Sequence, residues 1–323
     1  MGRTRAGTAR SALGGGAPLS AGHALEAALV TGLGGALHAL PWRTSLGAGA
    51  ALGDVARMFG IRRRVAEANL ARAFPERSQR ERAAILTSHY RELGRVATEY
   101  ARLGELVRAP AGAVVAEARG LEHLERARAA GRGAILLSGH YGNIELLGAW
   151  LGQMHSVSFV VRPLSNARIE AWIARRRAEA GVGTIPASTR VREVYAGLRA
   201  NQWMAMLADQ DARRHGVFVP FLGTPASTAT GPARIAIATG APIIMGFATR
   251  RTDGRVELDI EPALMPEDPA AADAAERLTA RHVAVLESWV RRHPAMWFWL
   301  HRRWKTAPPI VASNDQEALR ASV

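Results

Sequence analysis

Two polar residues, five positions apart, are the first sign of chemistry in this sequence. His140 follows the short apolar run at residues 133–138, and Glu145 stands where the next apolar segment begins. Gly139 and Gly142 bracket the histidine, so the backbone there can turn tightly or lie close to a ligand. An imidazole held by a carboxylate can act as a general base. The pattern therefore indicates either a catalytic pair or a strand-to-helix turn that holds two polar side chains.

The role of Glu145 has two interpretations that the sequence leaves open. A carboxylate in the first turn of a helix is stabilised by the helix dipole. The same carboxylate can orient the imidazole of His140 and select its tautomer. Side chains on one helix meet at spacings of three or four residues, so a spacing of five requires His140 to precede the helix and Glu145 to lie inside it.

Asp209 and Asp211, in the stretch "LADQDARRHG", are the next candidates. A carboxylate behind a histidine completes a pair of base and orienting residue. Aspartates also form turns, and the D-x-D spacing is compatible with a metal ligand pair. No further ligand cluster stands at binding spacing in the sequence. We therefore expect Asp209 to support catalysis and Asp211 to contact substrate, with no metal or redox cofactor.

Several residues are candidates for binding an anionic substrate. Arg162 can contact a phosphate or a developing oxyanion, or it can be an ordinary surface arginine. Arg302 and Arg303, in "WFWLHRRWKT", can meet the phosphates of a lipid headgroup, while the aromatic residues there suit either a core or a membrane-interface belt. We also assign Asn143, in the turn after His140, to substrate binding.

The spacing of apolar runs predicts the elements that position these residues. Buried-strand candidates lie at residues 133–138, 157–162, 203–208 and 242–248, with amphipathic stretches at 142–153, 165–180, 190–200 and 231–239 between them. This alternation predicts β–α–β crossovers and a mostly parallel sheet. Residues 255–261 alternate apolar and polar side chains, which favours an antiparallel or edge strand. A long helix is expected over about residues 270–293.

The polar candidates stand where these strands end. The first strand is followed by His140, the second by Arg162, the third by Asp209, and the fourth ends near Arg250. In an open α/β sheet the functional groups lie in the crevice beyond the carboxyl ends of the strands. We therefore expect these side chains to share one rim of the sheet.

The N-terminal third of the chain reads as helical. Apolar residues three and four apart predict two helices within residues 51–106, separated by Pro75, and Ser78 with Glu81 has the spacing of a capping box. The apolar stretch at residues 24–40 falls short of the about 20 residues of a spanning helix. It suits a marginal span, an interfacial or re-entrant anchor, or a helix packed on the core.

These patterns together predict an α/β fold with a mostly parallel central sheet flanked by helices and an N-terminal helical membrane-associating extension. The expected divisions are a basic N-terminus at 1–20, the helical region at 21–106, an α/β core at 107–306 and a tail at 307–323.

Composition narrows the classes of function. The chain has 323 residues and no cysteine, which excludes disulfides, zinc–thiolate sites and cysteine nucleophiles. Its net charge is +14, and Lys305 is the only lysine among 42 basic residues. Such a charge suits an anionic membrane surface or nucleic acid. The sequence has no signature of a nucleic-acid-binding motif, so a non-catalytic basic binding protein is the weaker alternative.

Several ordered motifs together resemble a known family. The H-x-x-x-x-E spacing from His140 to Glu145 resembles the signature of glycerolipid and lipid A acyltransferases. Further stretches resemble the late lipid A acyltransferases in particular. They are "LLSGHYGNIELLG", "VVRPLSNARIE", the stretch from "ADQDARRHG" to "GAPII", and "WFWLHRRWKT". In the helical lead-in, "NLARAFPE" and "YRELGRVATEY" also match. The resemblance covers about residues 20–306.

The resemblance implies a division of roles and a cellular place. His140 would be the general base, Glu145 the motif acid, and Arg162 and Asp209 supporting residues of the active site. It implies an inner-membrane protein facing the cytoplasm, with acyl carrier protein as the acyl donor and an anionic glycolipid as acceptor. A related branch acylates phosphatidylinositol mannosides from acyl-CoA, and it stays open as the alternative; the "DQD" here is closer to the lipid A branch.

Overall fold

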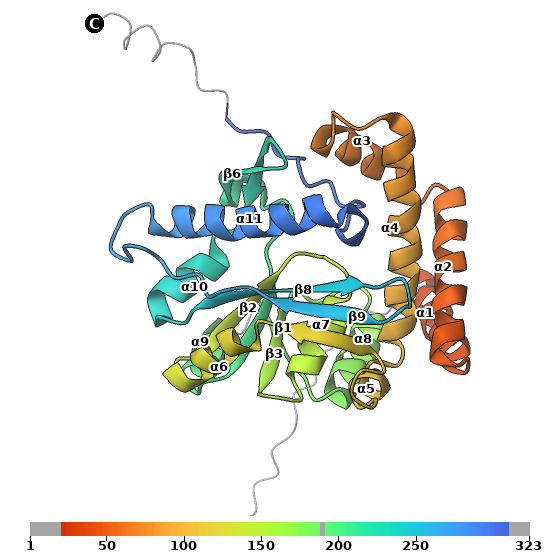
Figure 1. The fold of residues 1–323 in the computed structure, drawn as a ribbon, viewed down its shortest axis with the longest axis horizontal. Coiled ribbons are helices and arrows are strands. Elements are labelled where there is room, and N and C mark those ends of the chain that lie inside the picture. Colours follow the sequence, from red (N-terminus) through yellow and green to blue (C-terminus); the bar gives the residue numbers. More distant parts are fainter. Residues whose placement is uncertain (1–20, 188–190, 310–323) are drawn as a thin grey trace, which may run out of the picture.

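The computed structural model describes residues 21–187 and 191–309, so the predictions for residues 1–20 and for the end of the tail lie outside it. A seven-stranded sheet forms its centre (Figure 1). The strands are β1 (Val115–Arg119), β2 (Ala134–Ser138), β3 (Val157–Val161), β4 (Gly183–Pro186), β5 (Trp203–Leu207), β8 (Ile243–Arg250) and β9 (Val256–Ile260), in the spatial order β1-β9-β8-β2-β5-β3-β4. Within this sheet of the described residues, only β8 and β9 pair antiparallel. The predicted mostly parallel sheet is confirmed.

Both faces of the sheet are covered, which is why its central strands are continuous apolar runs. All five residues of β2 are buried, and Leu136 and Leu137 join different hydrophobic clusters on opposite faces. The helices of this part are α6 (Leu121–Ala130), α7 (Ile144–Leu151), α8 (Ala167–Glu179), α9 (Val191–Arg199), α10 (Gly231–Thr239) and α11 (Ala274–Arg292). Figure 1 shows α11 on one side of the sheet and α7 and α8 on the other.

Four strands were not predicted from the sequence. β1 and β4 lie at the two edges of the sheet and are only partly buried, so their apolar pattern is weak. β6 (Val217–Phe221) and β7 (Thr224–Thr228) pair as a separate antiparallel hairpin. Edge and hairpin strands do not need the continuous apolar run that identified the central strands.

The N-terminal region is a layer of helices beside the sheet. It contains α1 (Ala21–His38), α2 (Trp42–Met58), α3 (Arg63–Ala73), α4 (Gln79–Tyr100) and α5 (Leu103–Leu106). The predicted capping box is confirmed, because the Ser78 hydroxyl accepts from the backbone of Glu81 and the Glu81 carboxylate accepts from the backbone of Ser78. In Figure 1, α1 and α2 lie on the side of α4 that faces away from the sheet.

The apolar stretch at residues 24–40, for which a marginal span, an interfacial anchor and a packed helix were all open, lies mainly in α1. Of the helices in the described residues, none combines the length and the apolar character needed to cross a bilayer. α1 instead packs on the protein, where Gly34 lies against the ring of Trp172 and the Asn166 amide donates to the backbone of His23 and to Glu26.

Glycines let α2 and α4 approach very closely. A Cβ atom on Gly94 of α4 would collide with the carbonyl oxygen of Gly49, and one on Gly53 of α2 would collide with the carbonyl oxygen of Tyr90. Backbone atoms cannot yield as side chains do, so these helices touch only because both carry glycine at the contact.

Substitution of Gly94 tests this contact. We expect Gly94→Ala to lower the free energy of unfolding by about 1–3 kcal/mol, because overpacking forces the backbones apart. The matched control is Gly47→Ala on the partner helix α2, where an added Cβ meets nothing within 4 Å. That change should stabilise the protein by about 0.5–1 kcal/mol. Urea unfolding measures both, and equal midpoints for the two variants would contradict the close packing.

Candidate active site

His140 and Asp209 meet at the carboxyl edge of the sheet. They follow β2 and β5, which are parallel neighbours with Ser138 paired to Leu207. The Nδ1 atom of His140 lies 2.7 Å from Oδ1 of Asp209, and the backbone N–H of His140 donates to Oδ2 at 2.7 Å. Trp297 donates its indole N–H to the same Oδ2 at 2.9 Å. The expectation that residues after different strands share one rim is confirmed for this pair.

The electrostatics of the pair follow from burial and from these contacts. Burial alone would raise the pKa of Asp209, but the attraction of His140 and the hydrogen bonds from His140 and Trp297 lower that pKa to about 2. Burial alone would lower the pKa of His140, but the charge of Asp209 and the hydrogen bond to it raise that pKa above its ordinary value of 6.5. Asp209 is therefore a carboxylate at neutral pH and a strong partner for the ring.

The opposite nitrogen of His140 faces the rim. When Nδ1–H donates to Asp209, Nε2 carries the lone pair that can take a proton. Its neighbour is the side-chain amide of Gln210, whose nitrogen lies 3.4 Å away. The His140 side chain is 32% exposed, so a hydroxyl group can reach it. The arrangement is that of a general base with an orienting carboxylate.

The turn that carries His140 is clamped by backbone bonds. The carbonyl of His140 accepts from Phe298 at 2.9 Å, and the N–H of Gly142 donates to the carbonyl of Met296 at 2.9 Å. Gly142 has a φ of +54° and lies against the carbonyl of Ala248, where a Cβ atom would collide. Only glycine therefore fits this position.

Glu145 lies inside α7, as the spacing required, and it is bound by Arg177 rather than by the imidazole. Arg177 of α8 donates from Nε at 3.0 Å and from Nη2 at 2.6 Å to the two carboxylate oxygens, and both side chains are buried. The carboxylate that contacts Nδ1 of His140 is therefore that of Asp209. Glu145 joins α7 to α8.

Asn143 is placed differently from its predicted role in substrate binding. Its Oδ1 accepts from the backbone of Leu146 at 2.9 Å, which caps α7, and its Nδ2 donates to Glu99 at 2.7 Å. The residue is 2% exposed. Both ends of the amide are hydrogen-bonded inside the protein, so this side chain links the turn to α4 and to the start of α7.

Arg303 is also placed differently from its predicted role, which was to bind the phosphate of a lipid headgroup. It is 1% exposed, and its guanidinium donates to the carbonyl of Ser227 and the hydroxyl of Thr228. Burial lowers its pKa to about 10. It faces the interior, whereas Arg302 is exposed. The neighbouring tryptophans are core residues: Trp297, Trp299 and Trp304.

A cavity of about 620 Å³ opens at His140 and runs between α7 and the sheet. Gln210, Asp211 and Arg162 line it together with His140. The rest of the wall is mainly apolar and includes Leu136, Leu147, Gly148, Phe159, Ile244 and Ile260. An apolar cavity of this size with a few convergent polar groups is typical of a small-molecule site.

Arg162 and Asp211 reach this cavity in different ways. Arg162 is exposed and available to a ligand. Asp211 is half-buried and accepts from the hydroxyl of Thr306 at 2.9 Å. The predicted contacts of both residues with substrate stay predictions.

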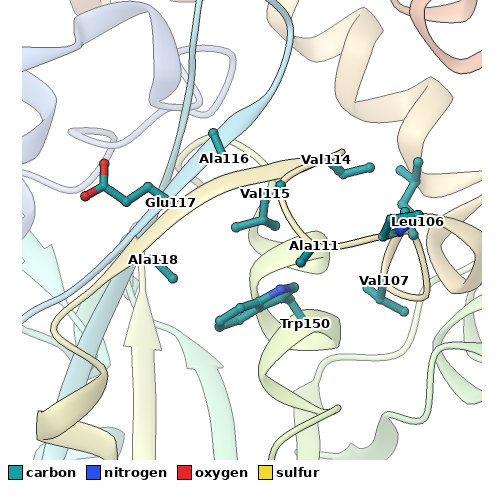
Figure 2. A pocket seen from close by; sticks show the side chains of 12 residues that line it. Leu106, Val107, Ala111, Val114, Val115, Ala116, Glu117, Ala118 and Trp150 are labelled. Atoms are coloured by element: carbon teal, nitrogen blue, oxygen red, sulfur yellow. The ribbon is translucent and has the colours of Figure 1, made fainter.

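A second pocket, of about 210 Å³, lies beside β1 (Figure 2). Trp150 of α7 and the apolar side chains of Val114 and Val115 line it, and Glu117 is the one charged residue in its wall. Its lining offers no base next to an orienting group. Across residues 21–187 and 191–309, no three carboxylate or imidazole side chains gather as a metal site would require.

Four residues of the site escaped sequence reasoning. Arg177 and Trp297 bind the two acids from elements far along the chain, and nothing local marks them. Glu99 lies in a helix and reaches Asn143 across 44 positions. Gln210 could have been found, because it stands between the two aspartates after β5.

Comparison with known proteins shows which family the chain belongs to. Residues 21–306 match the family of bacterial lipid A biosynthesis acyltransferases. The chain belongs to this family. The H-x-x-x-x-E spacing from His140 to Glu145 lies within the matched residues, and both of these side chains line the cavity.

Named relatives in this acyltransferase family fall in two branches. The lipid A biosynthesis lauroyltransferase of Escherichia coli is 28% identical over 289 residues, which is 85% of this chain and 90% of that enzyme. The palmitoleoyltransferase of the same organism is 26% identical over 275 residues, 83% and 87% of the two chains. The phosphatidylinositol mannoside acyltransferase of Mycobacterium tuberculosis is 30% identical over 190 residues. That match spans 57% of this chain and 58% of the mycobacterial enzyme.

Titration of His140 tests the pairing independently of activity. We expect its imidazole to titrate above pH 6.5, and Asp209→Asn to lower that pKa, because burial then acts without the opposing charge. The pair stabilises the fold fully between about pH 3.8 and pH 6.5. That stability is lost as the pH rises through the raised pKa of His140, and as it falls through the lowered pKa of Asp209.

Nuclear magnetic resonance of the histidine rings measures the titration at increasing pH. Asp211→Asn is the matched control, since Asp211 is bonded to Thr306. An unchanged His140 titration in Asp209→Asn would contradict the pairing.

Proposed function

We propose that this protein transfers a fatty acyl chain from a thioester donor to a hydroxyl of a lipid A precursor, with His140 as the general base. The observation that carries the proposal is the imidazole at the cavity mouth, with Nδ1 held by Asp209 and Nε2 facing the rim. Nε2 takes the proton of the acceptor hydroxyl while the hydroxyl oxygen attacks the carbonyl carbon of the thioester. The C–S bond of the tetrahedral intermediate then breaks, and the leaving thiolate takes the proton from the imidazolium.

The cavity suits the acyl chain of such a donor. Its apolar wall between α7 and the sheet begins where the reacting carbonyl would lie beside His140. The exposure of Arg162 at the cavity supports a contact with an anion, and Arg302 is also exposed. We propose that Glu145 acts through Arg177 by holding the wall, since removal of either partner would leave a buried charge without compensation.

The donor and acceptor follow from charge and from the relatives. A chain of net charge +14 favours an acidic acyl carrier protein and a phosphorylated glycolipid. The lipid A enzymes match over the larger share of the chain, which supports a lipid A precursor as acceptor. The 30% identity to the mycobacterial enzyme supports the alternative, transfer from acyl-CoA to a phosphatidylinositol mannoside.

Replacement of His140 tests the proposal. We expect His140→Ala to slow acyl transfer by about 10²–10⁴-fold, because general-base catalysis is lost. The assay supplies radiolabelled acyl carrier protein thioester or acyl-CoA to the full-length protein, with a lipid A precursor and a phosphatidylinositol mannoside offered in parallel. The acceptor that becomes labelled distinguishes the two branches.

His123→Ala is the control, since His123 lies on α6. Undiminished turnover by a folded His140→Ala protein would refute the proposed base, and labelling of neither acceptor by the unaltered protein would refute the proposed function.

We also propose that the N-terminal helices rest on the cytoplasmic face of the inner membrane. Leu25, Leu29 and Leu33 recur every four residues on one face of α1, and Leu29 is 64% exposed. Met58 and Phe59 at the end of α2 are 76% and 81% exposed. We call these five side chains the docking face. Large exposed apolar side chains are costly in water, and an interfacial helix buries them at the boundary of the acyl chains.

Arginines support an anionic lipid as the partner of the docking face. Arg62, Arg63 and Arg64 are exposed directly after Phe59 and Ile61. Basic residues near a membrane surface each add about 1 kcal/mol of attraction to anionic headgroups.

Charge substitution on the docking face tests this attachment. Phe59→Glu combined with Leu29→Glu should weaken binding to phosphatidylglycerol vesicles at least about tenfold, because burial of each side chain contributes about 1.5–3 kcal/mol. Val191→Glu is the control, since Val191 on α9 is 50% exposed but lies outside the docking face. Vesicle co-sedimentation measures binding, and equal binding by the double variant and the control would overturn the assignment.

A further inference from the structure

A buried ion cluster lies behind the His140 turn. Arg250, at the end of β8, donates from Nε to both oxygens of Glu92 at 2.8 Å and from its two Nη atoms to both oxygens of Glu99, at 2.8 and 2.7 Å. All three side chains are 4% exposed or less. One guanidinium is thus shared by two carboxylates of α4.

The two carboxylates have different second partners. Glu92 lies 3.5 Å from the partly exposed Arg95. Glu99 accepts the amide N–H of Asn143 at 2.7 Å. Only Glu99, of this pair, therefore connects the cluster to the turn that carries His140.

This contact explains why residue 143 is an asparagine. Asparagine, aspartate and serine are about equally good at the N-cap of a helix. An aspartate would cap α7 equally well, but it would set its carboxylate against that of Glu99. The amide alone both caps the helix through Oδ1 and donates to Glu99 through Nδ2.

The position of Glu99 is itself rigidly determined. Glu92 and Glu99 are two turns apart on α4 and so lie on one face of it. Another face carries Gly94 against the backbone of Gly49 on α2. The residues between His140 and Asn143 also contact β8, where the Tyr141 hydroxyl lies 3.2 Å from that of Thr249.

We propose that Glu99 is a positioning residue for His140: through Asn143 it sets the turn that directs Nε2 into the cavity. The inference rests on the proposed function. A displacement of about 1 Å in a reacting group can cost about 10²-fold in rate. Loss of the Glu99–Asn143 bond should therefore lower kcat and leave KM nearly unchanged, since neither residue lines the cavity.

The test exchanges the two polar groups. Asn143→Asp should lower kcat about 10- to 100-fold, because the turn shifts to separate two carboxylates. The double variant Glu99→Gln with Asn143→Asp has the same net charge as the natural pair, and its glutamine can donate to the new aspartate. We expect it to recover kcat to within a few-fold of the unaltered protein. If Asn143→Asp does not fold, Asn143→Ser replaces it in the test, because serine can still cap the N-terminus of α7.

Glu92→Gln is the matched control. It weakens the same Arg250 cluster on the same helix but has no contact with Asn143 in the described structure, so it should lower stability while kcat stays within twofold. Equal losses of kcat in Glu92→Gln and Asn143→Asp would overturn the proposal, as would failure of the double variant to recover.

A readout besides activity separates this inference from the proposed function. The ring-nitrogen resonances of His140 at fixed pH report its position against Asp209. They should shift in Asn143→Asp, return in the double variant and stay unchanged in Glu92→Gln. If the unaltered protein labels no acceptor, the proposed function fails while these resonances still decide the positioning role. Resonances unchanged in Asn143→Asp would overturn that role.

Discussion

The buried carboxylate of Asp209 is the group on which the site depends. A charge removed from water is costly unless hydrogen bonds and an opposite charge compensate it. Asp209 obtains this compensation from the ring and backbone of His140 and from the indole of Trp297. These bonds join the ends of β2 and β5 to the segment that follows α11. The same bonds that stabilise the carboxylate select the tautomer of His140 that leaves Nε2 open to the cavity.

A second set of buried charges is neutralised by arginines. Glu145 is neutralised by Arg177, and Glu99 and Glu92 by Arg250. Each pair joins a helix to a neighbouring element: α7 to α8, and α4 to β8. Both ends of the motif, His140 and Glu145, line the cavity, but they have different partners: Asp209 binds His140 and Arg177 binds Glu145. In Asn143, two bonds on one amide fix both the start of α7 and the link to α4.

The helical N-terminal layer belongs to the same machinery. α4 carries Glu99 toward the sheet, and its glycine contact with α2 lies behind it. α1 and α2 expose the apolar docking face. An acyltransferase that acts on a lipid must meet its acceptor at a membrane surface. The helices proposed to touch that surface pack directly on α4, the helix that carries Glu99.

The sequence by itself determined the central strands, the crossover helices and the rim where His140 and Asp209 meet. Strands buried on both faces need continuous apolar runs, and parallel strands end at one edge. Only the tertiary structure decided which acid orients His140: Glu145 is five positions away and Asp209 sixty-nine, yet Asp209 makes the bond. It also turned Asn143 and Arg303 inward and placed the edge strands β1 and β4. Which side chains pair with one another depends on strand register and on helix packing across the sheet. The local spacing of residues along the chain specifies neither of these.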